Sequence, residues 1–158
     1  MKNILEGGGV AMLNEILNFL NDKESVKILV NVDDSGLPHP AVKGSLRSED
    51  GNIIYTEVIE SSNTNRFLNR ALWLNKKVSI LLITSNKRSF KIVAQPTKAI
   101  VSGKVFQKYY EEVQNRNKNF DLSTVWIFKP LEIVEQKSKR GELQKTLFLH
   151  LDRLAKES

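Results

Sequence analysis

The pattern of apolar and polar residues predicts a mainly β protein flanked by helices. Residues 10–21 carry apolar side chains at helical spacing and predict an opening amphipathic helix. Residues 26–32 alternate between apolar and polar side chains, which is the period of a half-buried strand. Five further strands are predicted, at residues 41–46, 52–59, 78–84, 89–105 and 123–136.

Turn and helix signals separate these strands. Asp33 to Gly36 predicts a turn, and Asp50-Gly51 predicts a tight hairpin, because glycine adopts positive φ without strain. Pro38 and Pro40 favour an edge position for the second strand, since proline donates no ladder hydrogen bond. By the same reasoning the fifth strand is interrupted near Pro96, and the last is broken or bulged at Pro130. Helices are predicted at residues 61–77, 106–117 and about 141–156.

Six strands joined mostly by tight turns favour an antiparallel sheet, and closure into a barrel would hide its edges. The chain has 158 residues and no internal repeat or linker-like segment. We therefore expect one domain over residues 1–158, with a helix at 10–21, a barrel over about 26–136 and a C-terminal helix.

Composition narrows the class of protein. Hydrophobic residues make up 41% and charged residues 27%, and no apolar run approaches the roughly 20 residues of a membrane-spanning helix. The absence of cysteine excludes disulfides, thiolate metal sites and cysteine nucleophiles. The N-terminus carries Glu6 and a glycine triplet and lacks a signal-peptide pattern, so a cytoplasmic location with no membrane partner is expected.

The charge distribution is uneven. Residues 61–110 hold ten Lys or Arg and no Asp or Glu, whereas residues 1–60 hold five basic and ten acidic residues. Such a tract repels itself unless acidic neighbours or a bound anion lie close. The sequence leaves both explanations open.

Motifs for catalysis are missing. His39 and His150 are the only histidines, and no metalloprotease, nucleophile-elbow or P-loop motif is present. Acidic pairs fall in predicted turns, where they stabilise the turn. The sequence therefore nominates no catalytic residue and no metal ligand.

One polar cluster predicts a ligand. Residues 61–66, Ser-Ser-Asn-Thr-Asn-Arg, follow the third strand and begin a helix. Free backbone N–H groups, hydroxyls and a guanidinium at a helix N-terminus together form a phosphate receptor. Taken alone, the same residues favour a simple helix cap with a surface arginine, because capping runs are common.

The order of these segments resembles the pyridoxamine 5′-phosphate oxidase-like split barrels, a family that binds FMN. The resemblance covers about residues 26–135. Its pieces are ILVNVDDSGLPHPAVKGSL (28–46), DGNIIYTE (50–57), SSNTNRFLNRALWLNKKVSILL (61–82), KAIVSGKV (98–105) and STVWIFKPLEIV (123–134).

This resemblance implies a six-stranded antiparallel, Greek-key-like split barrel that binds FMN at a homodimer interface, with its phosphate held by the second strand and the helix after the third. It also implies an oxidoreductase acting on a small redox substrate. Asn75-Lys76 departs from the family's Asn-Pro, and the Arg-x-His motif of the vitamin B6 oxidases is missing, so that activity is not expected. The residues nominated for FMN are Lys43, Ser45, Ser62, Thr64, Asn65, Arg66 and Lys98. Many relatives carry Gln at the position of Lys98.

Two alternatives remain open. A small basic barrel could bind nucleic acid, with Phe90, Tyr109, Tyr110 or Trp126 as stacking platforms. The spread of basic residues over both faces of the predicted strands argues against it. The barrel could also store or sense a flavin without turnover, because flavin chemistry resides in the cofactor.

Overall fold

The computed structural model describes residues 10–137, and within them it contains one antiparallel sheet and three α-helices. The mainly β class predicted from the sequence is confirmed, with seven strands in place of six. The predicted C-terminal helix lies outside the described residues. The strands are β1 (Val26–Val32), β2 (Pro38–Val42), β3 (Arg47–Glu49), β4 (Asn52–Glu57), β5 (Val78–Ile83), β6 (Ser89–Ile100) and β7 (Thr124–Glu135). The helices are α2 (Val10–Asn18), continued by a 3₁₀ turn η1 (Phe19–Asn21), α3 (Asn63–Trp73) and α4 (Gly103–Arg116).

The strand order β2-β1-β5-β6-β7-β4-β3 places β2 and β3 at opposite edges of the sheet. The connection of residues 43–46 passes from one edge to the other. The predicted second strand exists, but its bounds of 41–46 are wrong, because β2 begins at Pro38 and ends at Val42. The physical reason is Lys27, a buried residue of β1 whose ammonium donates to the carbonyls of Gly44 (2.9 Å) and Leu46 (3.0 Å). These two carbonyls are held by a side chain and not by a neighbouring strand.

The hairpin between β3 and β4 is confirmed. Asp50 and Gly51 have φ angles of 52° and 78°, and Glu49 pairs with Asn52 across a two-residue loop. Positive φ at both central positions gives the type of turn whose twist matches that of the flanking strands. The loop fixes the register of β4, whose end forms part of the candidate site.

The long strands β6 and β7 pair over most of their length, with two irregularities. One register shift falls between Val93 and Ala94, opposite Pro130, and the other falls between Pro96 and Lys98. The bulge predicted at Pro130 is confirmed. A break was expected near Pro96. The strand only shifts register there and continues to Ile100. Residues 103–105, expected in this strand, begin α4 instead.

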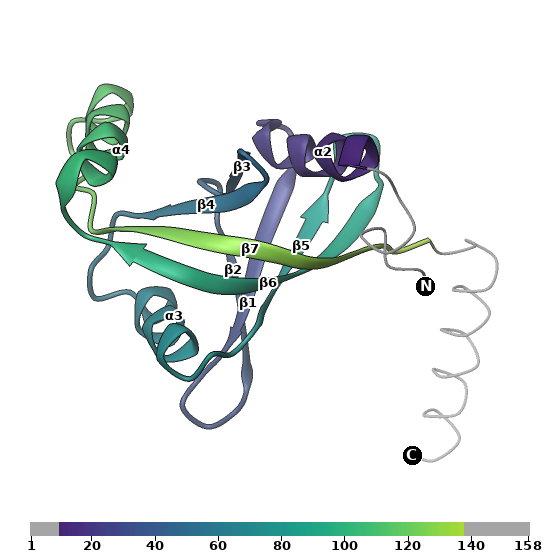
Figure 1. The fold of residues 1–158 in the computed structure, drawn as a ribbon, viewed down its shortest axis with the longest axis horizontal. Helices are drawn as coiled ribbons and strands as arrows, with labels where there is room; N and C mark the ends of the chain where they lie inside the picture. Colours follow the sequence, from purple (N-terminus) through teal and green to yellow (C-terminus); the bar gives the residue numbers. More distant parts are fainter. Residues whose placement is uncertain (1–9, 138–158) are drawn as a thin grey trace, which may run out of the picture.

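Two apolar clusters hold the elements together. The larger contains Trp126, Tyr55, Phe90 and Phe128 and lies between the sheet, α2 with η1, and α3. The smaller lies under α4 and includes Tyr109 and Val113. Figure 1 shows α2 and α3 on opposite sides of β6 and β7, and α4 beyond the end of β6 where β7 begins. Within residues 10–137, no helix has the length and apolar character needed to span a bilayer.

Candidate functional site

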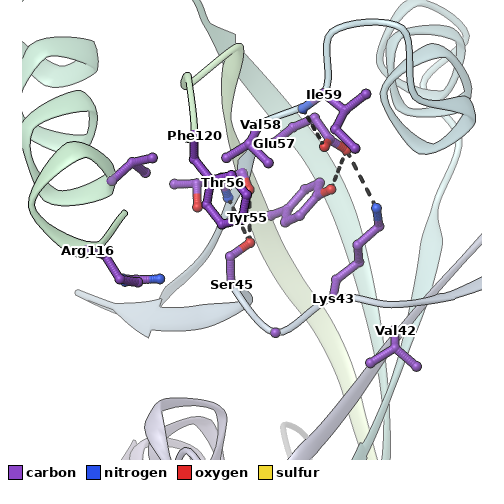
Figure 2. Close-up of a pocket in the computed structure, with 12 residues that line it drawn as sticks. Val42, Lys43, Ser45, Tyr55, Thr56, Glu57, Val58, Ile59, Arg116 and Phe120 are labelled. Atoms are coloured by element: carbon purple, nitrogen blue, oxygen red, sulfur yellow. Dashed lines mark hydrogen bonds and ion pairs between the residues drawn. The ribbon is translucent and has the colours of Figure 1, made fainter. Parts of the chain in front are cut away.

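A pocket of about 250 Å³ opens where the 43–46 connection passes the end of β4 (Figure 2). Residues from the connection form one wall, and residues from β4 and the segment after it form another. The end of α4 and the loop that follows it supply the third wall. The lining residues are Val42, Lys43, Gly44, Ser45, Tyr55, Thr56, Glu57, Val58, Ile59, Val113, Arg116 and Phe120.

The carboxylate of Glu57 is the centre of the pocket's hydrogen-bond network. Its side chain is only 3% exposed. It accepts hydrogen bonds from the Tyr55 hydroxyl, the Ser62 hydroxyl (2.8 Å) and the Ile59 backbone N–H (3.0 Å). Burial, and next the hydrogen bond to Glu57, raise the pKa of Tyr55 far above its usual value. Tyr55 therefore remains a hydrogen-bond donor, and the carboxylate is surrounded by donors.

Lys43 supplies the positive charge beside this carboxylate. Its Nζ lies 3.6 Å from Oε2 of Glu57 and 5.5 Å from the centre of the Tyr55 ring. The side chain is 20% exposed. An ammonium has three donors, so Lys43 keeps bonding capacity on the side that faces the pocket.

Ser45 fixes the connection to β4. Its hydroxyl donates to the carbonyl of Thr56 (2.9 Å) and accepts from the Thr56 backbone N–H (3.3 Å). A side chain thus replaces a neighbouring strand at this point in β4. These two bonds satisfy both backbone groups of Thr56 and tie the connection to β4 at the wall of the pocket.

Arg116 is the pocket residue that sequence reasoning missed. It ends α4, is exposed, and its guanidinium makes no hydrogen bond or ion pair with the described part of the chain. In Figure 2, Lys43 and Arg116 lie on opposite sides of Ser45. A basic residue in the last turn of a helix is ordinarily explained by the helix dipole, so the sequence carried no signal that α4 ends at this pocket.

The start of α3, predicted as the phosphate receptor, is occupied by its own cap. The Ser62 hydroxyl accepts from the backbone N–H of Asn65 (2.9 Å) while donating to Glu57. The Asn65 side chain donates to the carbonyl of Glu60 (3.0 Å) and accepts from the indole of Trp126 (3.0 Å). Thr64 is buried. These side chains mainly hold α3 against the sheet.

The remaining nominated residues lie away from the pocket. Arg66 forms an ion pair with Asp34 of the β1–β2 turn (3.2 Å), and Lys98 is exposed on β6. Of the seven nominated residues, Lys43 and Ser45 line the pocket and Ser62 reaches it through Glu57. Cofactor binding by any of them stays a prediction.

Acidic residues from outside the basic tract neutralise part of it. Asp34 pairs with Arg66 and Arg70, Glu49 with Lys108, and Glu135 with Arg88. This bears on the nucleic-acid alternative, which also needed exposed aromatic rings. Phe90, Tyr109 and Trp126 are buried in the two clusters, so they are not available as stacking platforms.

No protein-family model and no curated protein matches the chain. Solved structures do match it. HupZ from Group A Streptococcus aligns with a TM-score of 0.62 at 19% identity, over 79% of this chain and 94% of that one. An FMN-binding protein from Syntrophomonas wolfei aligns with a TM-score of 0.61 at 21% identity, over 81% and 90%. A candidate pyridoxamine 5′-phosphate oxidase from Lactobacillus delbrueckii aligns at 0.56 and 16% identity, over 85% and 99%.

The chain has the pyridoxamine 5′-phosphate oxidase-like split-barrel fold. The resemblance inferred from the sequence is thereby confirmed at the level of the fold. Identities of this size carry no site residue from one protein to another. The chemistry of this split barrel therefore has to be argued from its own pocket.

Proposed function

We propose that this split barrel binds FMN in the pocket beside the 43–46 connection and serves as a flavin-dependent oxidoreductase. The observation that carries the proposal is the pair of cations, Lys43 and Arg116, on either side of the Ser45 hydroxyl. Phosphate favours guanidinium and ammonium donors, and the aromatic side chains of Tyr55 and Phe120 line the same pocket. An FMN-binding protein of the same fold supports the choice of cofactor.

The charges of the pocket fit a phosphate despite the nearby acid. Glu57 is buried and already accepts three hydrogen bonds, and Lys43 lies against it. Arg116 has no such counter-ion among the described residues. We therefore infer that Arg116 makes the main phosphate contact and that Lys43 offsets the charge of Glu57 and adds a second donor.

The size of the pocket supports a homodimer. Pockets that enclose a drug-sized ligand measure about 300–1,000 Å³, so the cavity of one chain is too small to enclose FMN. Exposed apolar side chains, Val42, Ile59 and Phe120, also lie around it. A second copy packed over these side chains would complete the pocket and cover them.

Within such a dimer the protein would bind and orient FMN, and the cofactor itself would carry out the redox chemistry. Bound FMN would supply hydride and electron transfer at its ring system. Lys43, Ser45 and Arg116 would anchor the phosphate, while Val42, Tyr55 and Phe120 would limit water around the ring. The reaction partner is then a small redox molecule that reaches the ring from the open side of the pocket.

Titration with FMN and with riboflavin tests the proposal, because riboflavin lacks the phosphate. We expect the purified protein to bind FMN and to quench its fluorescence. Arg116→Ala should weaken FMN binding by about 1.5–3 kcal/mol, the range for a hydrogen bond to a charged group, and should leave riboflavin binding nearly unchanged. Lys43→Ala should act in the same direction.

Two control variants sharpen the result. Lys118→Ala removes an exposed cation two residues beyond Arg116, outside the pocket lining, and Arg66→Ala removes a cation that pairs with Asp34. Both should retain wild-type FMN affinity. A protein that binds no flavin, or that loses FMN with Arg66→Ala and not with Arg116→Ala, would overturn this assignment. Turnover of the bound flavin with a nicotinamide nucleotide would separate an enzyme from a flavin store.

A further inference from the structure

A second cavity, of about 310 Å³, lies between α3, the end of β1 and the residues that precede β5. It shares no lining residue with the pocket proposed for FMN. Asn31 of β1 lines it and is only 3% exposed. Neither polar atom of the Asn31 side chain, Oδ1 or Nδ2, has a hydrogen-bond partner.

An unpartnered buried amide requires an explanation. Buried polar side chains nearly always have hydrogen-bond partners, because leaving them unpaired costs free energy. On the inward face of β1, Lys27 is satisfied by three carbonyls and Leu29 packs in the core. Asn31 occupies the third position of that face, where an apolar residue would pack without cost. Its amide needs a partner from outside the protein, and either ordered water or a ligand that enters the cavity would supply it.

The surrounding side chains define the chemistry of that ligand. Phe67 and Ala71 of α3, together with Leu74 just after the helix, form an apolar wall that suits a flat ring. Lys76 and Lys77 also line the cavity, and their ammonium groups make no ion pair with any residue from 10 to 137. Arg70 is already paired with Asp34. Two lysines without counter-ions favour an anionic group at the open end.

We propose that this cavity binds a small anionic ligand with a flat ring that carries an adjacent carbonyl and N–H. Both amide atoms of Asn31 are covered in this structure, so recognition requires the side chain to turn toward the cavity, where Nδ2 donates to a carbonyl and Oδ1 accepts from an N–H. Lys76 and Lys77 contact a phosphate or carboxylate on the same molecule. Both a pyrimidine nucleotide and a nicotinamide nucleotide present this chemistry, the first through a ring imide and the second through an exocyclic carboxamide.

Side-chain amide resonances of the ¹⁵N-labelled full chain provide a direct test. Uridine 5′-monophosphate and nicotinamide mononucleotide are the two probes, and ribose 5-phosphate, which lacks the ring and the amide edge, is the control ligand. We expect the Asn31 Nδ2 resonances to shift in a saturable manner with at least one probe and not with ribose 5-phosphate. The probe that shifts them identifies the source of the amide edge. If neither probe shifts the Asn31 resonances, the proposal is refuted and ordered water remains as the partner of Asn31.

Matched variants test the two halves of the site. Asn31→Leu should raise the thermal midpoint and weaken binding of the active probe at least tenfold. Ser25→Ala removes a different buried polar group without a partner, a hydroxyl outside this cavity, and should leave probe binding unchanged. Full probe affinity in Asn31→Leu would overturn the role of the amide.

Substituting both Lys76 and Lys77 with Ala should weaken binding of the nucleotide probe at least fivefold at low salt. It should leave binding of the corresponding uncharged base unchanged. Lys118→Ala is the control for an exposed lysine elsewhere. Arg116→Ala, which is expected to lose FMN, should keep full probe binding, and this separates the present inference from the proposed function.

Discussion

The indole Nε1 of Trp126 donates a hydrogen bond to Oδ1 of Asn65 over 3.0 Å, and both residues are buried. This bond joins the middle of the sheet to the first turn of α3. The same asparagine donates to the carbonyl of Glu60, just before the helix. One side chain thus sets the position of α3. This helix forms a wall of the Asn31 cavity, and its N-cap residue, Ser62, bonds to Glu57.

Asn65→Ala should destabilise the fold. The substitution leaves a buried indole N–H without its acceptor, and an unpaired buried donor costs about 1–3 kcal/mol. We expect a loss of that size in the free energy of unfolding measured with urea. Asn69→Ala, which removes a partly buried bond made by an exposed side chain of the same helix, is the control and should cost about 0.5 kcal/mol or less. Equal losses for the two variants would contradict this view of Asn65.

Lys27→Met should be more severe. The Lys27 ammonium donates to the carbonyls of Leu20 (3.0 Å), Gly44 (2.9 Å) and Leu46 (3.0 Å), and so it joins η1 to the 43–46 connection. Methionine fills a similar volume but leaves these acceptors without their donor. We expect a loss of about 3 kcal/mol or more in urea unfolding, and weaker FMN binding because Lys43 and Ser45 lose their support. Lys23→Met, at an exposed position, should change neither measurement.

Glu57→Gln separates stability from binding. Glutamine retains one acceptor oxygen but loses the charge opposite Lys43, so unfolding should become easier by about 1–3 kcal/mol. If FMN occupies the pocket, its affinity should rise several-fold, because one negative charge no longer opposes the phosphate. Fluorescence titration at fixed salt measures the second effect. An affinity that falls in a folded variant would mean that Glu57 itself contacts the cofactor.

Acid should weaken the contact between β3 and α4. Hydrogen bonds from Lys108 and then Tyr109 hold the pKa of Glu49 below its ordinary value. The folded state therefore binds fewer protons than the unfolded state in the acid range. The stabilisation is complete above the unfolded pKa of about 4.3 and is lost as pH falls through the lower folded pKa.

Glu49→Gln should consequently show a smaller loss of stability between pH 7 and pH 3 than the wild type, by up to about 1 kcal/mol, given that the pair is partly exposed. Urea unfolding at several pH values measures it. Glu24→Gln, an exposed carboxylate with no hydrogen bond or ion pair to the part of the chain that the structure describes, is the control and should leave the slope unchanged.

Gly51→Ala should destabilise the β3–β4 hairpin by about 1 kcal/mol, because φ at this position is 78° and a Cβ strains that conformation. Gly44→Ala is the matched control. Gly44 is outside the positive φ region, and a Cβ there would meet no atom within 4 Å. A chemical denaturation series on the two variants gives the comparison, and a larger loss at Gly44 would contradict it.

Local signals predicted much of the fold. The Asp50-Gly51 hairpin, the alternation of residues 26–32 and the apolar spacing in α3 each depend on residues close in sequence. Steric limits on φ and the periods of strands and helices act over a few residues, so the sequence alone determines these elements. The turns that join β1 to β2 and β3 to β4 follow from the same signals, whereas β3 itself was not predicted as a separate strand.

The tertiary structure decided where these units meet and which charged groups share a pocket. Residues 43–46 look like a continuing strand until Lys27, distant in sequence, captures their carbonyls. Glu57 looks like an ordinary solvent-facing acid until Tyr55, Ser62 and Lys43 surround it. Arg116 joins the same pocket only because α4 ends there. Hydrogen bonding and burial depend on proximity in space, and the folding of the chain, not the order of its residues, brings these groups together.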